Sequence, residues 1–133
     1  MRSDRPKYNA KKTIVDGHAF PSMLEATRYK QLRALEDAGE ITDLRLQPEF
    51  QVFKGYVNPR TGEKIKSIHY VADFQYVDRD GHQVIVEDTK GKETDVFRMK
   101  WKLVQSEYPE FVFRKLTSKD VKNGGLDEGG KRR

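Results

Sequence analysis

Two apolar segments on either side of an Asp-Gly dipeptide constrain this chain most, because together they predict a β-hairpin. The segments are residues 70–77 and 84–90, and the dipeptide occupies positions 80–81. Asp-Gly is favoured in two-residue hairpin turns, in which both central residues need a positive φ. Such a turn places Val77 opposite Val84, and the register of every other pair follows.

Three charged side chains of this hairpin are expected on one face of the sheet. Counting along the strands places Asp73 opposite Asp88 and Val71 opposite Lys90. Because side chains alternate between faces, Asp73, Asp88 and Lys90 project together, whereas Glu87 points to the other face. Two directly opposed carboxylates repel and destabilise a hairpin unless a positive charge lies between them. An ordinary solvated face is the alternative, but the valines on the same face disfavour it.

A divalent cation would relieve this repulsion. Oxygen ligands without cysteine and without clustered histidine favour Mg²⁺, or Mn²⁺ as a substitute, over zinc. Lys90 either forms a simple salt bridge or orients a water and stabilises charge on a phosphate. The pattern is therefore a candidate site for metal-assisted phosphodiester hydrolysis.

Composition limits the class of protein. A chain of 133 residues predicts one domain, and the absence of cysteine excludes a disulfide framework and a thiolate zinc site. No apolar run approaches the roughly 20 residues of a membrane-spanning helix, and the first residues lack the apolar segment of a signal peptide. We therefore expect a cytoplasmic protein with no membrane partner. The net charge of +5 fits a polyanionic partner, although basic termini are equally compatible with simple solvation.

Hydrophobic periodicity and turn residues predict an α/β fold with the order αβββαβ, a mixed sheet flanked by helices. Pro48 inside the first strand predicts an edge position or a bulge. The last strand is expected to run parallel to an earlier one, because a helix connects them. The expected elements are a turn segment at 13–20, a helix at 21–38 closed by Gly39, a strand at 44–53, a loop at 55–64, the hairpin, a helix at 94–107 and a strand at 111–116.

Three regions are predicted along the chain, and each predicted helix has a stripe of residues expected to face the core. These regions are a basic N-terminal arm at 1–13, the main domain at 14–116, and a polar tail at 117–133 that is disordered beyond about Asn123. The predicted stripes are Leu24, Arg28, Leu32 and Leu35 in the first helix, and Val96, Met99, Lys100 and Leu103 in the second.

Glu25 has two possible roles. Ser22-Met23-Leu24-Glu25 matches a capping box, in which the Glu side chain returns to the Ser22 backbone amide. If this helix instead packs against the face that carries Asp73 and Asp88, Glu25 is a third carboxylate of the metal site. The sequence leaves both roles open.

In this order, the residues resemble the PD-(D/E)xK nuclease superfamily. The resemblance lies in a Glu on the first helix, an Asp on the second strand, an Asp-x-Lys on the third and a basic helix after it, and it covers roughly residues 8–116. Ala72 replaces the proline of the pattern, which is a mild departure because the following carboxylate is the metal ligand. Within the superfamily the chain is most similar to small phage-encoded endonucleases related to archaeal-type Holliday junction resolvases. The supporting motifs are Ser22-x-x-Glu25, Leu46-Gln47-Pro48-x-Phe50, Tyr70-x-Ala72-Asp73-Phe74 and Glu87-Asp88-x-Lys90-Gly91.

The resemblance implies a restriction-endonuclease-like core and a Mg²⁺-dependent endodeoxyribonuclease. Asp73 and Asp88 would bind the metal with the Thr89 carbonyl, and Glu25 would contribute through a water. Lys90 would position the attacking water or stabilise the scissile phosphate. Gln47 would orient the same water, although a strand glutamine commonly only satisfies backbone or solvent. No protein nucleophile is required, because a metal-activated water carries out the hydrolysis.

The expected partner is branched or duplex DNA, and the expected assembly is a homodimer. Basic side chains around the site would contact phosphates, although each is equally consistent with a solvated charge. The favoured function is a phage Holliday junction resolvase acting in DNA recombination. A nicking or flap-processing nuclease and a non-catalytic DNA-binding module are the alternatives. The candidate DNA-binding residues are Lys92, Arg98, Lys100, Lys102, Lys11 and Lys12.

Overall fold

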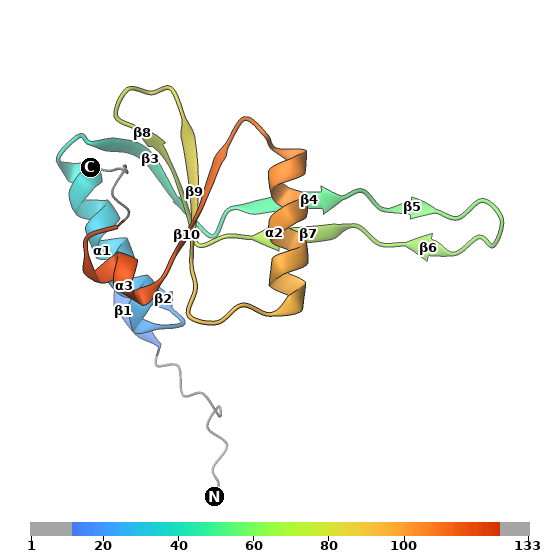
Figure 1. Cartoon of the computed structure of the whole chain (residues 1–133), viewed down its shortest axis with the longest axis horizontal. Coiled ribbons are helices and arrows are strands. Elements are labelled where there is room, and N and C mark those ends of the chain that lie inside the picture. Colours follow the sequence, from blue (N-terminus) through green and yellow to red (C-terminus); the bar gives the residue numbers. More distant parts are fainter. Residues whose placement is uncertain (1–11, 126–133) are drawn as a thin grey trace, which may run out of the picture.

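A computed structural model describes residues 12–125 and shows an α/β fold around a four-stranded mixed sheet (Figure 1). The strand order is β10–β9–β8–β3, in which β9 is parallel to β10, antiparallel to β8, and β8 is antiparallel to β3. The expected mixed sheet and parallel last strand are confirmed. The strands are β3 (Ile41–Leu46), β8 (Phe74–Asp78), β9 (Val84–Thr89) and β10 (Val112–Leu116).

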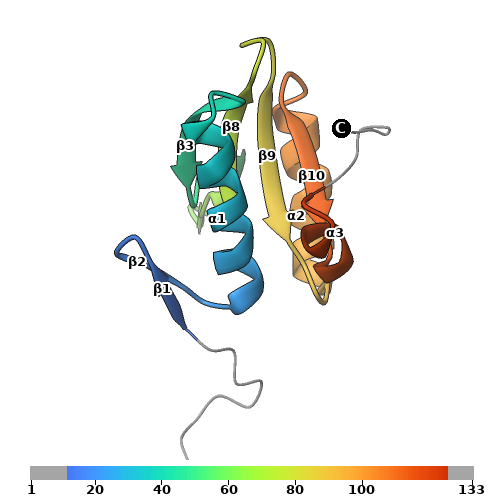
Figure 2. The ribbon, with the colours of Figure 1, turned by 90° about the vertical axis from the view of Figure 1, so that its left-hand side faces the viewer.

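Helices cover both faces of this sheet. Figure 2 shows α1 (Met23–Asp37) in front of the sheet and α2 (Asp95–Glu107) behind it. Consecutive residues of β9 pack on opposite faces of the sheet: Ile85 joins the core beneath α1, and Val86 joins the core beneath α2. A strand that is buried on both faces needs an unbroken apolar run, which explains the pattern at the start of β9.

The hairpin has the predicted register but a different turn. Val77 pairs with Val84, as expected. Of the Asp-Gly dipeptide, only Gly81 has a positive φ, at 70°, so the two-residue turn is wrong. The Asp78 carboxylate accepts hydrogen bonds from the backbone amides of His82 and Gln83 and stabilises a longer loop. This local side-chain acceptor competes with the tight turn.

The predicted strand 44–53 is two strands, because the chain turns at Gln47-Pro48. Gln47 has a φ of 55°, and Pro48 has no amide to continue the ladder of β3. Beyond this break a long two-stranded ribbon, residues 49–71, starts beneath α2 and projects from the body at its far end (Figure 1). Val71 therefore pairs with Glu49 and not with Lys90, and the predicted loop 55–64 is largely the end of the ribbon. The ribbon consists of β4 (Glu49–Phe53), β5 (Tyr56–Val57), β6 (Lys64–Ile65) and β7 (Ile68–Val71).

Both predicted helices form, but the buried face of α2 differs from the prediction. α1 starts after Ser22 and ends before Gly39, which has a φ of 78°. Its inner face includes Arg28 and Leu32 as expected, with Leu24 and Leu35 half-buried. In α2, Val96 and Met99 are 57% and 47% exposed, so these two positions of the predicted stripe are wrong, whereas Leu103 packs against the core as expected. The larger aromatic side chains decide the rotation of the helix, and the residues that face the sheet are Phe97, Trp101 and Val104.

Residues 117–122 are not part of a polar tail. They form α3 (Ser118–Lys122) with a complete capping box between Thr117 and Asp120. Val121 is 1% exposed, and its carbonyl accepts a hydrogen bond from the Gln31 side chain of α1. The boundary predicted at 117 is therefore wrong as a structural boundary.

The N-terminal turn segment is confirmed as a small hairpin of β1 (Thr13–Val15) and β2 (His18–Phe20). Asp16 and Gly17 at its turn both have a positive φ. The predictions for residues 1–11, including Lys11, and for the chain beyond 125 lie outside the described residues. Within residues 12–125, no helix has both the length and the apolar character needed to cross a membrane.

Candidate functional site

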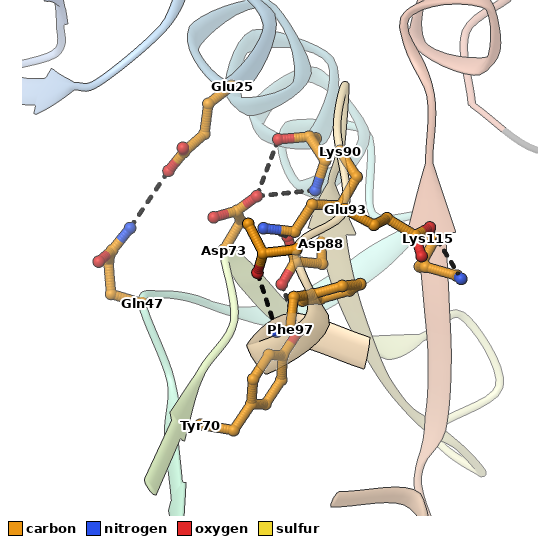
Figure 3. A network of polar contacts seen from close by, with 11 residues as sticks. Glu25, Gln47, Tyr70, Asp73, Asp88, Lys90, Glu93, Phe97 and Lys115 are labelled. Carbon is orange, nitrogen blue, oxygen red and sulfur yellow. Dashed lines mark hydrogen bonds and ion pairs between the residues drawn. The ribbon is translucent and has the colours of Figure 1, made fainter. Parts of the chain in front are cut away.

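Five of the predicted site residues come together at one end of the sheet (Figure 3). Four elements meet there: the first turn of α1, the break between β3 and β4, the start of β8 and the end of β9. These elements supply Glu25, Gln47, Asp73, Asp88 and Lys90, with Glu25 linked to Gln47 and Asp88 close to Lys90.

Asp73 is fixed by both its backbone and its side chain. Its amide donates to the Glu87 carbonyl at 3.0 Å, and its carbonyl accepts from the Gln47 amide at 2.9 Å. One carboxylate oxygen, Oδ2, accepts hydrogen bonds from the Thr89 amide at 2.7 Å and from the Thr89 hydroxyl at 2.8 Å. Thr89 therefore orients Asp73, and a role of the Thr89 carbonyl as a ligand stays a prediction.

Asp88 is 3% exposed and lies between two side chains. Its Oδ2 accepts a hydrogen bond from the Tyr70 hydroxyl, and its Oδ1 is 3.5 Å from Lys90 Nζ. Lys90 in turn lies 4.4 Å from the centre of the Phe97 ring, which limits its position. As the alternation predicts, Glu87 points to the opposite side, where Arg28 binds it.

Tyr70 was not predicted as a site residue. Simple alternation back from Asp73 places Tyr70 on the other face, and the chain bends at Asp73 between β7 and β8, so alternation does not continue from one strand into the other. The only sequence signal was its position in the Tyr70-x-Ala72-Asp73 motif.

Glu25 belongs to the site and does not complete the predicted capping box. The helix N-terminus is capped by Ser22 Oγ, which accepts from the Glu25 amide at 3.1 Å. The Glu25 carboxylate instead accepts from Gln47 Nε2 at 3.2 Å. A hollow of about 420 Å³ opens beside Glu25, Gln47 and Asp73, and residues 17–21 line its other side.

The pKa values of all three carboxylates are raised, first of all by burial. Burial and the charges of Asp73 and Asp88 raise the pKa of Glu25 to about 7. Burial and the charge of Asp73 raise the pKa of Asp88 to about 6. Burial also raises the pKa of Asp73, although the hydrogen bonds from Thr89 oppose this effect. Negative charge is thus concentrated where little water screens it, and Lys90 offsets it in part.

The donor set suits a divalent cation with an incomplete protein shell. Within residues 12–125, no three His, Cys, Asp or Glu side chains are grouped closely enough to form a full ligand cluster. Mg²⁺ does not require one, because it is commonly held by one or two carboxylates with waters and substrate phosphates as the other ligands. Asp73 and Asp88 provide two hard carboxylates of raised pKa, and a cation would relieve their repulsion.

The predicted phosphate-binding residues have different surroundings. Arg98 is already paired with Asp95 at 2.6 Å, whereas Lys92 and Lys102 are exposed and Lys100 is half-buried. Lys12 is exposed on the N-terminal side. Lys115, which was not predicted, is 3.0 Å from Glu93 beside the Phe97 and Trp101 rings (Figure 3).

The raised pKa of Glu25 predicts a pH-dependent stability. The folded protein holds the Glu25 proton more firmly than the unfolded chain, so the stabilisation is complete below the unfolded pKa of 4.5 and is lost as pH rises through about 7. In EDTA at pH 8, Glu25→Gln is expected to raise the thermal unfolding midpoint by on the order of 5 °C, because glutamine is uncharged. At pH 5 the two proteins should unfold at nearly the same temperature. Circular dichroism melts at both pH values measure this, and a Glu25→Gln protein no more stable than wild type at pH 8 would contradict it.

Comparison with known proteins identifies a family. A search of curated proteins found no match, and neither did a search of solved structures. A family model described as "Protein of unknown function (DUF1064)" matches residues 5–122, which include the whole sheet, both long helices and every residue of the site. The chain therefore belongs to the DUF1064 family.

Proposed function

We propose that this protein is a metal-dependent DNA endonuclease whose core is of the PD-(D/E)xK, restriction-endonuclease-like type. The observation that carries the proposal is the convergence of Glu25, Asp73 and Asp88 with Lys90 at one end of the sheet. Three mutually repelling carboxylates are costly for stability, and a site that binds a cation and a phosphate gives them a function.

Asp73 and Asp88 are the residues that would hold Mg²⁺, or Mn²⁺ in its place. The bound metal supplies Lewis acidity, which offsets phosphate charge and lowers the pKa of water. Thr89 keeps the Asp73 carboxylate in place through two hydrogen bonds, and Tyr70 does the same for Asp88.

Glu25 and Gln47 act on the attacking water in this proposal. The Glu25 carboxylate lies beside Asp73 and Asp88 and is the group that would accept a proton from this water. The Gln47 amide holds the Glu25 side chain at 3.2 Å and restricts its rotation. Lys90 provides a fixed positive charge for a phosphate oxygen, because Asp88 and the Phe97 ring both restrict its ammonium group.

The proposed substrate is branched DNA, with Holliday junctions first. The net charge of +5 and exposed lysines near the site favour a polyanion. The small size of the chain favours recognition of DNA shape over base sequence. The proposal includes a homodimer that cuts a junction symmetrically during phage DNA recombination in the cytoplasm.

The test is cleavage of a labelled synthetic four-way junction beside flap, nicked and linear duplexes of matched sequence. Each substrate is incubated with Mg²⁺, with Mn²⁺ or with EDTA. Paired cuts in the junction that require metal are the expected result. Cuts at flaps or nicks would support the proposed active site but would show that the substrate is not the junction. Binding without cleavage of any DNA would instead favour a non-catalytic DNA-binding module.

A further inference from the structure

The ribbon is an ordered projection with an exposed surface. Tyr56 and Val57 near its end are 52% and 56% exposed. The turn at the tip is held by backbone hydrogen bonds: the Asn58 amide donates to the Glu63 carbonyl, and the Gly62 amide donates to the Asn58 carbonyl. This organisation holds side chains at a defined distance from the body.

The ribbon carries basic charge that the described part of the chain does not neutralise. Residues 54–66 contain four basic side chains and one acidic side chain, Glu63. Within residues 12–125, none of the four basic residues forms an ion pair, although seven other Lys and Arg side chains do. Of the four, Lys54, Lys64 and Lys66 also line a hollow of about 700 Å³ together with Tyr56. The four are Lys54, Arg60, Lys64 and Lys66.

The shape of the ribbon fits double-helical DNA. The major groove of B-DNA admits a two-stranded β-ribbon, and Lys and Arg contacts to phosphates position such elements. Tyr56 pairs with Ile65 and Val57 with Lys64, so polar and apolar groups occur on both faces of the ribbon. A ribbon that lies in a groove is contacted by DNA on both of its faces. Side chains of both kinds on both faces suit such a contact better than a contact with one flat surface.

The ribbon is joined to the candidate site through both of its strands. β4 follows Gln47-Pro48 directly, and β7 leads through Ala72 into Asp73. The Ala72 amide donates to the Pro48 carbonyl at 3.0 Å and closes the base of the ribbon. At roughly 3.3 Å per residue, residues 49–57 span about 30 Å, which is close to the 34–36 Å of one DNA turn.

We propose that the ribbon binds the duplex that flanks the cleaved phosphate, about one helical turn away from it. Lys54, Lys64, Lys66 and Arg60 contact phosphates, and Tyr56 and Val57 enter the groove. This inference rests on the proposed nuclease function, because it takes the cut to lie at the carboxylate site.

The first test measures binding without cleavage. The triple variant Lys54→Glu/Lys64→Glu/Lys66→Glu is titrated with a labelled 30-base-pair duplex in EDTA by fluorescence anisotropy. Its affinity at low salt is expected to fall at least about tenfold. The slope of log K against log salt concentration should decrease by about 0.9 for each phosphate that the variant no longer neutralises.

A charge-matched control separates position from net charge. Lys30→Glu/Lys119→Glu/Lys122→Glu makes the same charge change on exposed residues of α1 and α3, which lie away from the ribbon (Figure 1). It should bind within about threefold of wild type. Equal loss of affinity in both variants, or no loss in the ribbon variant, would overturn the inference.

Binding also distinguishes this inference from the proposed function. If wild type cuts DNA and the ribbon variant binds normally, the nuclease proposal stands and the ribbon inference fails. If no DNA is cut but the ribbon variant loses affinity, the ribbon contact stands as a property of a DNA-binding protein, and the nuclease proposal fails.

The second test locates the tip on DNA. The chain has no cysteine, so Thr61→Cys provides a single thiol at the tip for an iron-EDTA label. Strand scission is expected about ten base pairs from the enzymatic cut, and the same label at Lys119→Cys should produce none there. Scission at the cut itself, or none from the tip, would contradict the proposed placement.

A second copy of the chain is the competing occupant of the ribbon. Sedimentation equilibrium of wild type and the ribbon triple variant decides between them. An unchanged oligomeric state in the variant supports the DNA contact. A dimer that becomes monomeric in the variant would show that the ribbon joins protomers and would overturn the inference.

Discussion

Asp88→Asn is expected to reduce the rate of DNA cleavage in Mg²⁺ by at least about a thousandfold. Asp88 is one of two carboxylates proposed to hold the metal, and asparagine removes the charge while it keeps an oxygen that accepts from the Tyr70 hydroxyl. The fold should therefore be retained. Single-turnover cleavage with saturating enzyme measures the chemical step without the contribution of substrate binding.

The binding control for this variant is DNA affinity in EDTA, which should stay within about threefold of wild type. Asp43→Asn is a matched substitution on β3: Asp43 is exposed, and its φ of 58° is tolerated equally by asparagine. It should cut at the wild-type rate. Cleavage by Asp88→Asn within tenfold of wild type would remove Asp88 from the proposed site.

Arg28→Met is expected to destabilise the fold by about 3–5 kcal/mol, because it leaves a buried carboxylate without its partner. Arg28 Nε and Nη2 donate to the two oxygens of Glu87 at 2.8 and 2.7 Å, and Glu87 is fully buried. The Tyr76 hydroxyl donates to the same carboxylate. The thermal unfolding midpoint should fall by roughly 10–20 °C, as measured by circular dichroism or urea unfolding.

Two further variants test the physical cause. Arg28→Met/Glu87→Leu removes both charges and should recover much of the stability, because no unpaired charge remains in the core. Arg33→Met breaks ion pairs with Glu36 and Asp37 on the same helix, which solvent screens, and should lower the unfolding midpoint far less than Arg28→Met does. A single Arg28→Met variant as stable as Arg33→Met would contradict this account.

The hairpin and most of the site could be predicted because they depend on local pattern. Alternation in the strands placed Asp88 and Lys90 on one face and Glu87 on the other, and the register from Val77 and Val84 extended to Asp73. The role of Glu25 was ambiguous, because the sequence Ser22 to Glu25 matches a capping box whether or not the Glu25 carboxylate turns back to the Ser22 amide. Its direction is decided by Gln47, which reaches it through the break before Pro48.

The elements that could not be predicted depend on contacts distant in sequence. The outer strands of the ribbon, β5 and β6, have two residues each and none of them is buried, so they carry no clear alternation, and Pro48 alone indicated the break after β3. α3 is a five-residue helix whose stability comes from the burial of Val121 against the rest of the fold. The rotation of α2 depends on the fit of Phe97 and Trp101 against the sheet, which a count of apolar residues did not anticipate.

The ribbon is inserted between β3 and β8, so its length can change without a change in the residues of the site. Phe50, Val52 and Tyr70 hold the inner part of the ribbon in the core, so residues can be added beyond these positions without moving Gln47, Asp73 or the contact of Tyr70 with Asp88. Two extra residues in each strand would extend the tip by about 7 Å and preserve its faces, whereas one extra residue in each would invert them. Related chains can therefore acquire different reach by insertions in even steps, and a longer or shorter ribbon is compatible with an unchanged set of carboxylates.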